Sequence, residues 1–118
     1  MLERPYQRLI AWQEAHKLCL WTYKITKSFP TEERFRLVNQ MCRSASSVPT
    51  NIAEGNAKRS AKEKAHFFEI ALCSLEELHY QCFLSKDLKY LHREQFAEVD
   101  DMVKRTSFLI TKLRLSFK

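Results

Sequence analysis

The chain has 118 residues, a single glycine, three prolines and a formal net charge of +6. This length suits one hydrophobic core. A β fold needs more glycine and proline for its turns than this chain has, so we expect residues 1–118 to form one helical domain. No apolar leader follows Met1 and no apolar run approaches the roughly 20 residues that cross a bilayer, so we expect a cytoplasmic protein without membrane contact.

Apolar residues recur every three or four positions in the first part of the chain, which predicts a helix over about 11–28. Phe29-Pro30 ends this pattern. Thr31 then resembles an N-cap, with glutamates in the first turn that follows it. The sequence therefore predicts a second helix over 32–54.

Two residues of the second helix have special backbone properties. Pro49 lies inside the pattern and predicts a kink and not a break, since it cannot donate to the carbonyl of residue 45. Gly55 follows the last predicted helical residue and suits the C′ position, where left-handed backbone is common. We therefore expect Gly55 to close the helix.

Two further helices follow. Ser60 to Glu63 form a capping-box sequence that predicts a third helix over about 61–88, and a heptad-like stripe predicts a fourth over about 93–116. Joints of a few residues force neighbouring helices to run antiparallel. The predicted fold class is all-α, an antiparallel up-down-up-down four-helix bundle.

Some apolar residues lie off the core stripes of their helices, where a monomer would leave them in water. We expect this second apolar surface to mediate homo-oligomer formation, against the alternative that single exposed aromatic residues are ordinary. Its members are Leu9, Leu20, Tyr23, Tyr80 and Phe83.

A polar row flanks the apolar stripe of the second helix. Such a row can fix the register of a neighbouring subunit or can line a binding surface, and we favour the interface. The row consists of Glu33, Gln40, Ser47, Asn51 and Glu54, with Arg36 and Arg43 beside it.

Basic residues gather before and within the third helix and on the fourth. Their concentration predicts contacts with the phosphates of RNA or DNA and little base specificity, although any one of them is an ordinary solvated side chain on its own. The alternative is a scaffold whose basic face meets an acidic protein. The candidate residues are Lys58, Arg59, Lys62, Lys64, Arg105 and Lys112, together with Arg36 and Arg43.

Catalytic and metal-binding patterns are weak. The four cysteines form no C-x-x-C pair and fall on or beside apolar stripes, as small hydrophobic residues do. Two Glu-x-x-His pairs, at Glu63 and Glu76, lie on the same predicted helix and point to opposite sides of it. No nucleophile is paired with a base, so we expect no enzyme activity, no catalytic residue, no metal or other cofactor, and no small-molecule substrate.

The chain also resembles a known family, the four-helix-bundle proteins encoded in intervening sequences of bacterial 23S ribosomal RNA genes, which are relatives of the accessory protein of diversity-generating retroelements. The densest match is the segment from Ser47 to Gly55, with Asn-Ile-Ala-Glu-Gly at its end. Cys42 and Cys73 depart from the family pattern. Further matches are Trp12, Phe29-Pro30, Glu33, Leu37, Gln40, Arg43, Ala45, Arg59, Ile70-Ala71 and residues 74–78.

This resemblance implies a homo-oligomer, typically a pentamer of bundles around an axis, with a basic surface proposed to engage nucleic acid. It implies no enzymatic activity and no cofactor. The cellular role, the nucleic-acid target and the number of subunits do not follow from the residues themselves.

Overall fold

The computed structural model describes residues 3–117, which form four long helices and three short 3-10 turns and contain no strand. The expectation of an all-α chain with four helices is confirmed. The elements in order are η1 (Pro5–Arg8), α1 (Ile10–Ile25), η2 (Thr26–Ser28), η3 (Thr31–Glu33), α2 (Leu37–Ala57), α3 (Ala61–Asp87) and α4 (Arg93–Leu115).

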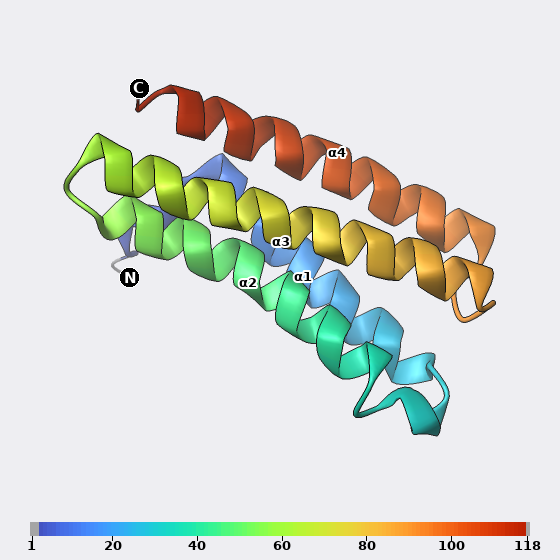
Figure 1. The fold of residues 1–118 in the computed structure, drawn as a ribbon. Helices are drawn as coiled ribbons and strands as arrows, with labels where there is room; N and C mark the ends of the chain where they lie inside the picture. The colour runs from blue at the N-terminus through green and yellow to red at the C-terminus, as the bar shows by residue number, and fades with distance from the viewer. Residues whose placement is uncertain (1–2, 118) are drawn as a thin grey trace.

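The four helices pack in a ring in which α1 contacts α2, α2 contacts α3, α3 contacts α4 and α4 contacts α1. In Figure 1 the chain reverses direction at each of the three joints. The predicted stripes meet inside this ring. Fully buried side chains from every helix form the core, among them Leu18, Met41, Val48, Ile52, Phe68, Leu75, Leu78, Cys82, Val99 and Ile110.

The start of α2 differs from the predicted helix over 32–54. Thr31 does not act as an N-cap, and residues 31–33 form the separate 3-10 turn η3. Arg36 then has φ −120° and ψ −103°, outside the helical region, so α2 begins only at Leu37. The Leu37 side chain at the start of α2 is buried in the core.

The end of α2 also differs from expectation. The helix runs unbroken through the buried Pro49 and on to Ala57, so Gly55 lies inside it with no positive φ. A Cβ at Gly55 would lie 2.8 Å from Phe68 Cε1 and 2.9 Å from Phe67 Cβ. Gly55 is therefore required because α2 and α3 approach closely there, and not because the helix ends.

The ends of α3 show one expected and one unexpected cap. The Ser60 hydroxyl accepts the Glu63 backbone N–H at 3.0 Å, as the sequence predicted for the start of α3. At its other end Lys89 takes the left-handed conformation with φ 66°, and the Tyr90 backbone N–H donates to the Ser85 carbonyl at 2.8 Å. The left-handed cap expected at Gly55 thus occurs one helix later, at a lysine.

Across residues 3–117, none of the helices combines the length and the apolar character that crossing a membrane requires.

We predict that Gly55→Ala lowers the free energy of unfolding by about 1–3 kcal/mol, because the added methyl group displaces the buried Phe68 ring or the α3 backbone. Intrinsic helix propensity alone favours alanine over glycine by about 1 kcal/mol, so the sign of the change isolates the steric effect. Thermal and urea melts measure it. Asn56→Ala is the control and should not lower stability; a Gly55→Ala protein as stable as the wild type would contradict the close approach.

Candidate functional site

Two joints of the chain meet at one end of the molecule. Tyr90, in the α3–α4 joint, donates its hydroxyl to Glu33 Oε2 at 2.9 Å, and its ring lies 5.3 Å from that of Phe29. The Glu33 carboxylate raises the pKa of Tyr90 in turn. This contact fastens the α3–α4 joint to the α1–α2 joint. It also removes Glu33 from the predicted polar row, because Glu33 lies in η3 and not on α2.

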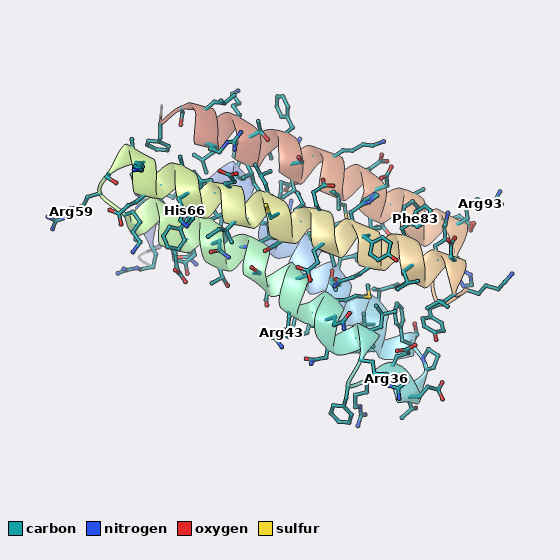
Figure 2. The ribbon with its side chains drawn as sticks, in the orientation of Figure 1. Arg36, Arg43, Arg59, His66, Phe83 and Arg93 are labelled. Atoms are coloured by element: carbon teal, nitrogen blue, oxygen red, sulfur yellow. The ribbon has the colours of Figure 1, made fainter. Side chains whose placement is uncertain are left out.

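The two joints carry a concentration of positive charge, which we call the basic end. Among residues 3–117, no carboxylate lies within 4.0 Å of the charged groups that define it. In Figure 2, Arg36 and Arg93 lie at the end of the molecule opposite Arg59. The exposed acids Glu32, Asp87 and Glu94 and the half-buried Glu33 lie in or beside the same joints, so the five cations exceed the carboxylates by a small margin. The basic end consists of Lys27, Arg34, Arg36, Lys89 and Arg93.

The predicted polar row on α2 is partly used within the chain. Ser47 Oγ lies 2.8 Å from Ser74 Oγ of α3, and Asn51 Nδ2 donates to the Ser47 carbonyl at 2.8 Å. Ser47 therefore joins α2 to α3, while Asn51 supports Ser47 from within α2. Gln40 and Glu54 remain exposed.

Arg43 lies apart from the basic end. It lines a shallow hollow between α2 and α3 together with Gln40 and the acidic Glu77. A carboxylate in the same hollow makes Arg43 a weaker candidate for an anion than Arg36, which lies in the joint itself.

The predicted cluster at the start of α3 divides into engaged and free side chains. Lys64 Nζ donates to the Asn56 carbonyl at 2.9 Å and lies 5.2 Å from the centre of the Phe117 ring, so it caps the end of α2. Lys58 Nζ lies 5.1 Å from the centre of the Phe67 ring. Among the described residues of this joint, only Arg59 and Lys62 project freely.

The two candidate residues on α4 also differ in whether they have a partner within the chain. Arg105, a candidate phosphate contact, donates from Nε to Glu14 Oε1 of α1 at 2.7 Å and is therefore engaged within the chain. The hydrogen bonds from Arg105 and then from Lys17 lower the pKa of Glu14. Lys112 is exposed and has no such partner within the described residues. The sequence could not reveal this ion pair, since 91 positions separate its members.

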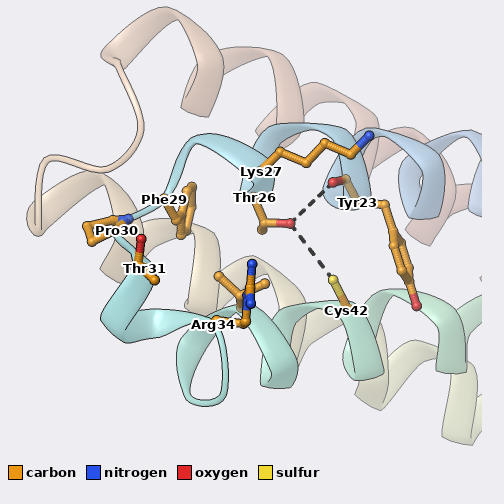
Figure 3. A pocket seen from close by; sticks show the side chains of 9 residues that line it. Tyr23, Thr26, Lys27, Phe29, Pro30, Thr31, Arg34 and Cys42 are labelled. Atoms are coloured by element: carbon orange, nitrogen blue, oxygen red, sulfur yellow. Dashed lines mark hydrogen bonds between the residues drawn. The ribbon is translucent and has the colours of Figure 1, made fainter.

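A cavity of about 430 Å³ opens beside the basic end, between the end of α1 and the start of α2. Figure 3 shows the Tyr23 ring beside the Cys42 thiol, the Lys27 side chain running along α1 and the Arg34 side chain pointing from the α2 side toward α1. The Thr26 hydroxyl lies 3.9 Å from Cys42 Sγ. None of the nine lining residues is acidic. The cavity therefore combines an aromatic wall with two cations.

The predicted second apolar surface is only partly present. Leu9 is half-buried and packs against the core, so its assignment to an exposed surface is wrong. Leu20, Tyr80 and Phe83 are exposed, while Tyr23 is 50% exposed and lines the cavity.

Among residues 3–117 the most exposed large apolar side chain is Phe35, at 83%, and the sequence did not predict it. The available signal was its position between two arginines, off the helical stripe. Phe108 on α4, 66% exposed, was also missed.

The remaining polar clusters contain His, Cys, Asp and Glu side chains, the usual protein ligands of metal ions. Within residues 3–117 no three His, Cys, Asp or Glu side chains gather closely enough to hold a metal ion. His79 Nε2 instead lies 2.8 Å from Asp100 Oδ1. Burial raises the pKa of the Cys82 thiol to about 12, so it is a packing group, whereas Cys73 is exposed, contrary to expectation.

These features define a helical protein whose exposed chemistry is cationic and aromatic. The chain belongs to the 23S rRNA-intervening sequence protein family, whose model matches residues 7–112, and the resemblance noted in the sequence is confirmed. No curated protein matches it.

The fold is similar to a crystal structure described as a protein with unknown function from the S23 ribosomal protein family of Bacteroides thetaiotaomicron VPI-5482. The TM-score is 0.82 at 21% sequence identity, covering 89% of this chain and 95% of the other. At this identity the likeness concerns the fold alone. Neither the family description nor this neighbour indicates an enzyme.

We predict that Arg105→Gln lowers the free energy of unfolding at pH 7 by less than about 1 kcal/mol, because a partly exposed ion pair with Glu14 is removed. Folding lowers the pKa of Glu14, so the pair stabilises the fold above the unfolded pKa of about 4.3 and ceases to do so as the pH falls through the folded pKa.

Thermal melts of the wild type and Arg105→Gln at pH 7 and at successively lower pH test this prediction, and the difference should shrink as the pH falls through the folded pKa of Glu14. Lys112→Gln removes the same charge from α4 without a partner and should change neither melt. A difference that persists unchanged in acid would show that the ion pair is not its cause.

Proposed function

We propose that the protein is a non-enzymatic homo-oligomer that binds the phosphate backbone of RNA or DNA through its basic end. The observation that carries the proposal is that Arg34, Arg36 and Arg93 have no carboxylate partner among residues 3–117. Lys104 and Arg105 are paired with acids, whereas Arg59 and Lys62 at the opposite end are also unpaired. The proposal selects the basic end because its cations come from two joints that one hydrogen bond holds side by side, where a polyanion can supply their counter-charge.

The arrangement favours a polyanion over a small ligand. The basic end draws on both joints, which the bond between Tyr90 and Glu33 holds together. Such a surface meets several phosphates of one strand at once. None of the helices in the described chain belongs to a known DNA- or RNA-binding motif that contacts base edges in a groove. Binding should therefore depend weakly on the nucleotide sequence.

The oligomer we propose uses separate faces of the molecule. Leu20 is on α1 whereas Tyr80 and Phe83 are on α3, and these two helices do not neighbour each other in the ring. Two different patches on different sides favour a head-to-tail contact between copies, which closes into a ring when the rotation permits. A ring of five is the number that the family resemblance implies.

Salt dependence tests the binding. We predict that log affinity for duplex DNA of arbitrary sequence falls linearly with log salt, and that Arg34→Gln/Arg36→Gln flattens the slope by about 0.9 for each phosphate that the variant no longer neutralises. Both side chains are exposed, so the fold should persist. Fluorescence anisotropy between about 50 and 200 mM salt gives the slopes.

Arg59→Gln/Lys62→Gln is the matched control, because it removes the same charge from the opposite end of the molecule. If this control flattens the slope and the Arg34/Arg36 variant does not, the binding surface is at the α2–α3 joint. If the wild type shows no salt-sensitive binding, the polyanion proposal fails and an acidic protein becomes the better partner.

Light scattering tests the oligomer. We predict a mass several times the 14.1 kDa of one chain, reduced by Tyr80→Lys because a charge enters an apolar contact on α3. Ala97→Lys, which adds the same charge to an exposed position of α4, should leave the mass unchanged. A single-chain mass for the wild type at micromolar concentration would contradict the oligomer.

A further inference from the structure

Phe35 occupies an unusual position in the basic end. It lies between η3 and α2, is 83% exposed, and is flanked in the chain by Arg34 and Arg36. Within residues 3–117 its ring takes part in no aromatic or cation–π pair. Nothing in the described chain therefore covers this ring or uses its faces.

The cavity beside Phe35 has the same combination of groups in a concave form. Arg34 lines the cavity and immediately precedes Phe35 in the chain, so the two features belong to the same joint, although the Phe35 ring is not part of the cavity wall. The walls include the Tyr23 ring, the half-buried Val38 and the two cations Lys27 and Arg34, without a carboxylate. Its volume of about 430 Å³ lies within the range of small-ligand pockets.

An unpaired nucleotide fits this combination. Its base offers flat π faces that stack on aromatic side chains whatever the base, and its phosphate carries the charge that lysine and arginine attract. In a duplex the bases are already stacked on one another and their faces are closed to protein side chains. Exposed aromatic rings among cations therefore favour single strands over duplexes.

Charge argues against a two-fold contact between copies of this chain through Phe35. A two-fold contact through Phe35 would place Arg34 and Arg36 of one copy near the same arginines of its partner. Like charges brought together at an interface are strongly unfavourable. A polyanionic occupant relieves this repulsion.

We infer that the basic end is a single-strand binding site in which Phe35 stacks on one base, the cavity walled by Tyr23 receives another, and Lys27, Arg34 and Arg36 hold the intervening phosphates. This inference rests on the proposed function and adds the form of nucleic acid. It assigns affinity to unpaired bases, whereas the proposed function requires phosphates alone.

The test compares three labelled probes of equal length by fluorescence anisotropy at fixed low salt: a mixed-sequence single strand, its duplex, and a fully abasic strand. The abasic strand keeps the phosphates and lacks the bases. Wild-type protein should bind the single strand at least roughly tenfold more tightly than the abasic strand, because each stacked base contributes about fivefold to a hundredfold in affinity.

Phe35→Ala should reduce this preference by about fivefold or more and leave affinity for the abasic strand unchanged. Tyr23→Ala should act in the same direction. Phe108→Ala is the matched control, since it removes an exposed ring from α4 about 22 Å along the helix axis from Arg93. Helical circular dichroism and light scattering of each variant verify fold and mass.

Equal affinity of the wild type for the single and abasic strands would overturn the inference, while a linear salt dependence in the same data would leave the proposed function standing. If the wild type shows no salt-sensitive binding to any of the probes, both the inference and the proposed function are wrong. If Phe35→Ala lowers the oligomeric mass and leaves the base preference unchanged, the ring is a contact between copies and the inference is wrong.

Discussion

The close approach of α2 and α3 at Gly55 is the constraint on which the rest of the structure depends. Glycine lets the buried Phe68 lie against the α2 backbone, where a single added carbon would be 2.8 Å from the ring. Ser47 and Ser74 join the same two helices further along, with their hydroxyl oxygens 2.8 Å apart. The remaining helices α1 and α4 each pack on this pair and on each other, so its geometry sets where the joints fall.

The distribution of charge follows from that arrangement. Packing α1 against α4 brings Arg105 to Glu14, and the turn of the α2–α3 joint brings Lys64 to the Asn56 carbonyl. Both cations are thereby used within the fold. The joints at the other end are fastened by the neutral Tyr90 hydroxyl, which donates to the Glu33 carboxylate. This bond uses no basic side chain, so the lysines and arginines of the basic end stay without an acidic partner within 4.0 Å among residues 3–117.

Most of the fold could be predicted from the sequence because it depends on local pattern. Buried stripes and the Ser60 cap need only the spacing of residues along one helix. The role of Gly55 could not be predicted, since it depends on which residue of another helix lies opposite. The candidate site likewise combines local and tertiary features. Arg36 could be chosen from its charge alone, whereas the pairing of Arg105 and the exposure of Phe35 depend on tertiary packing.

Photo-cross-linking tests most directly the claim that the basic end meets nucleic acid. A single-stranded oligonucleotide carrying 5-iodouracil, irradiated with the wild-type protein at low salt, should attach to the chain between residues 23 and 36, above all at Tyr23 and Phe35. Peptide mass spectrometry locates the attachment. Cross-links confined to residues 58–64 or to α4, with none between 23 and 36, would contradict the account.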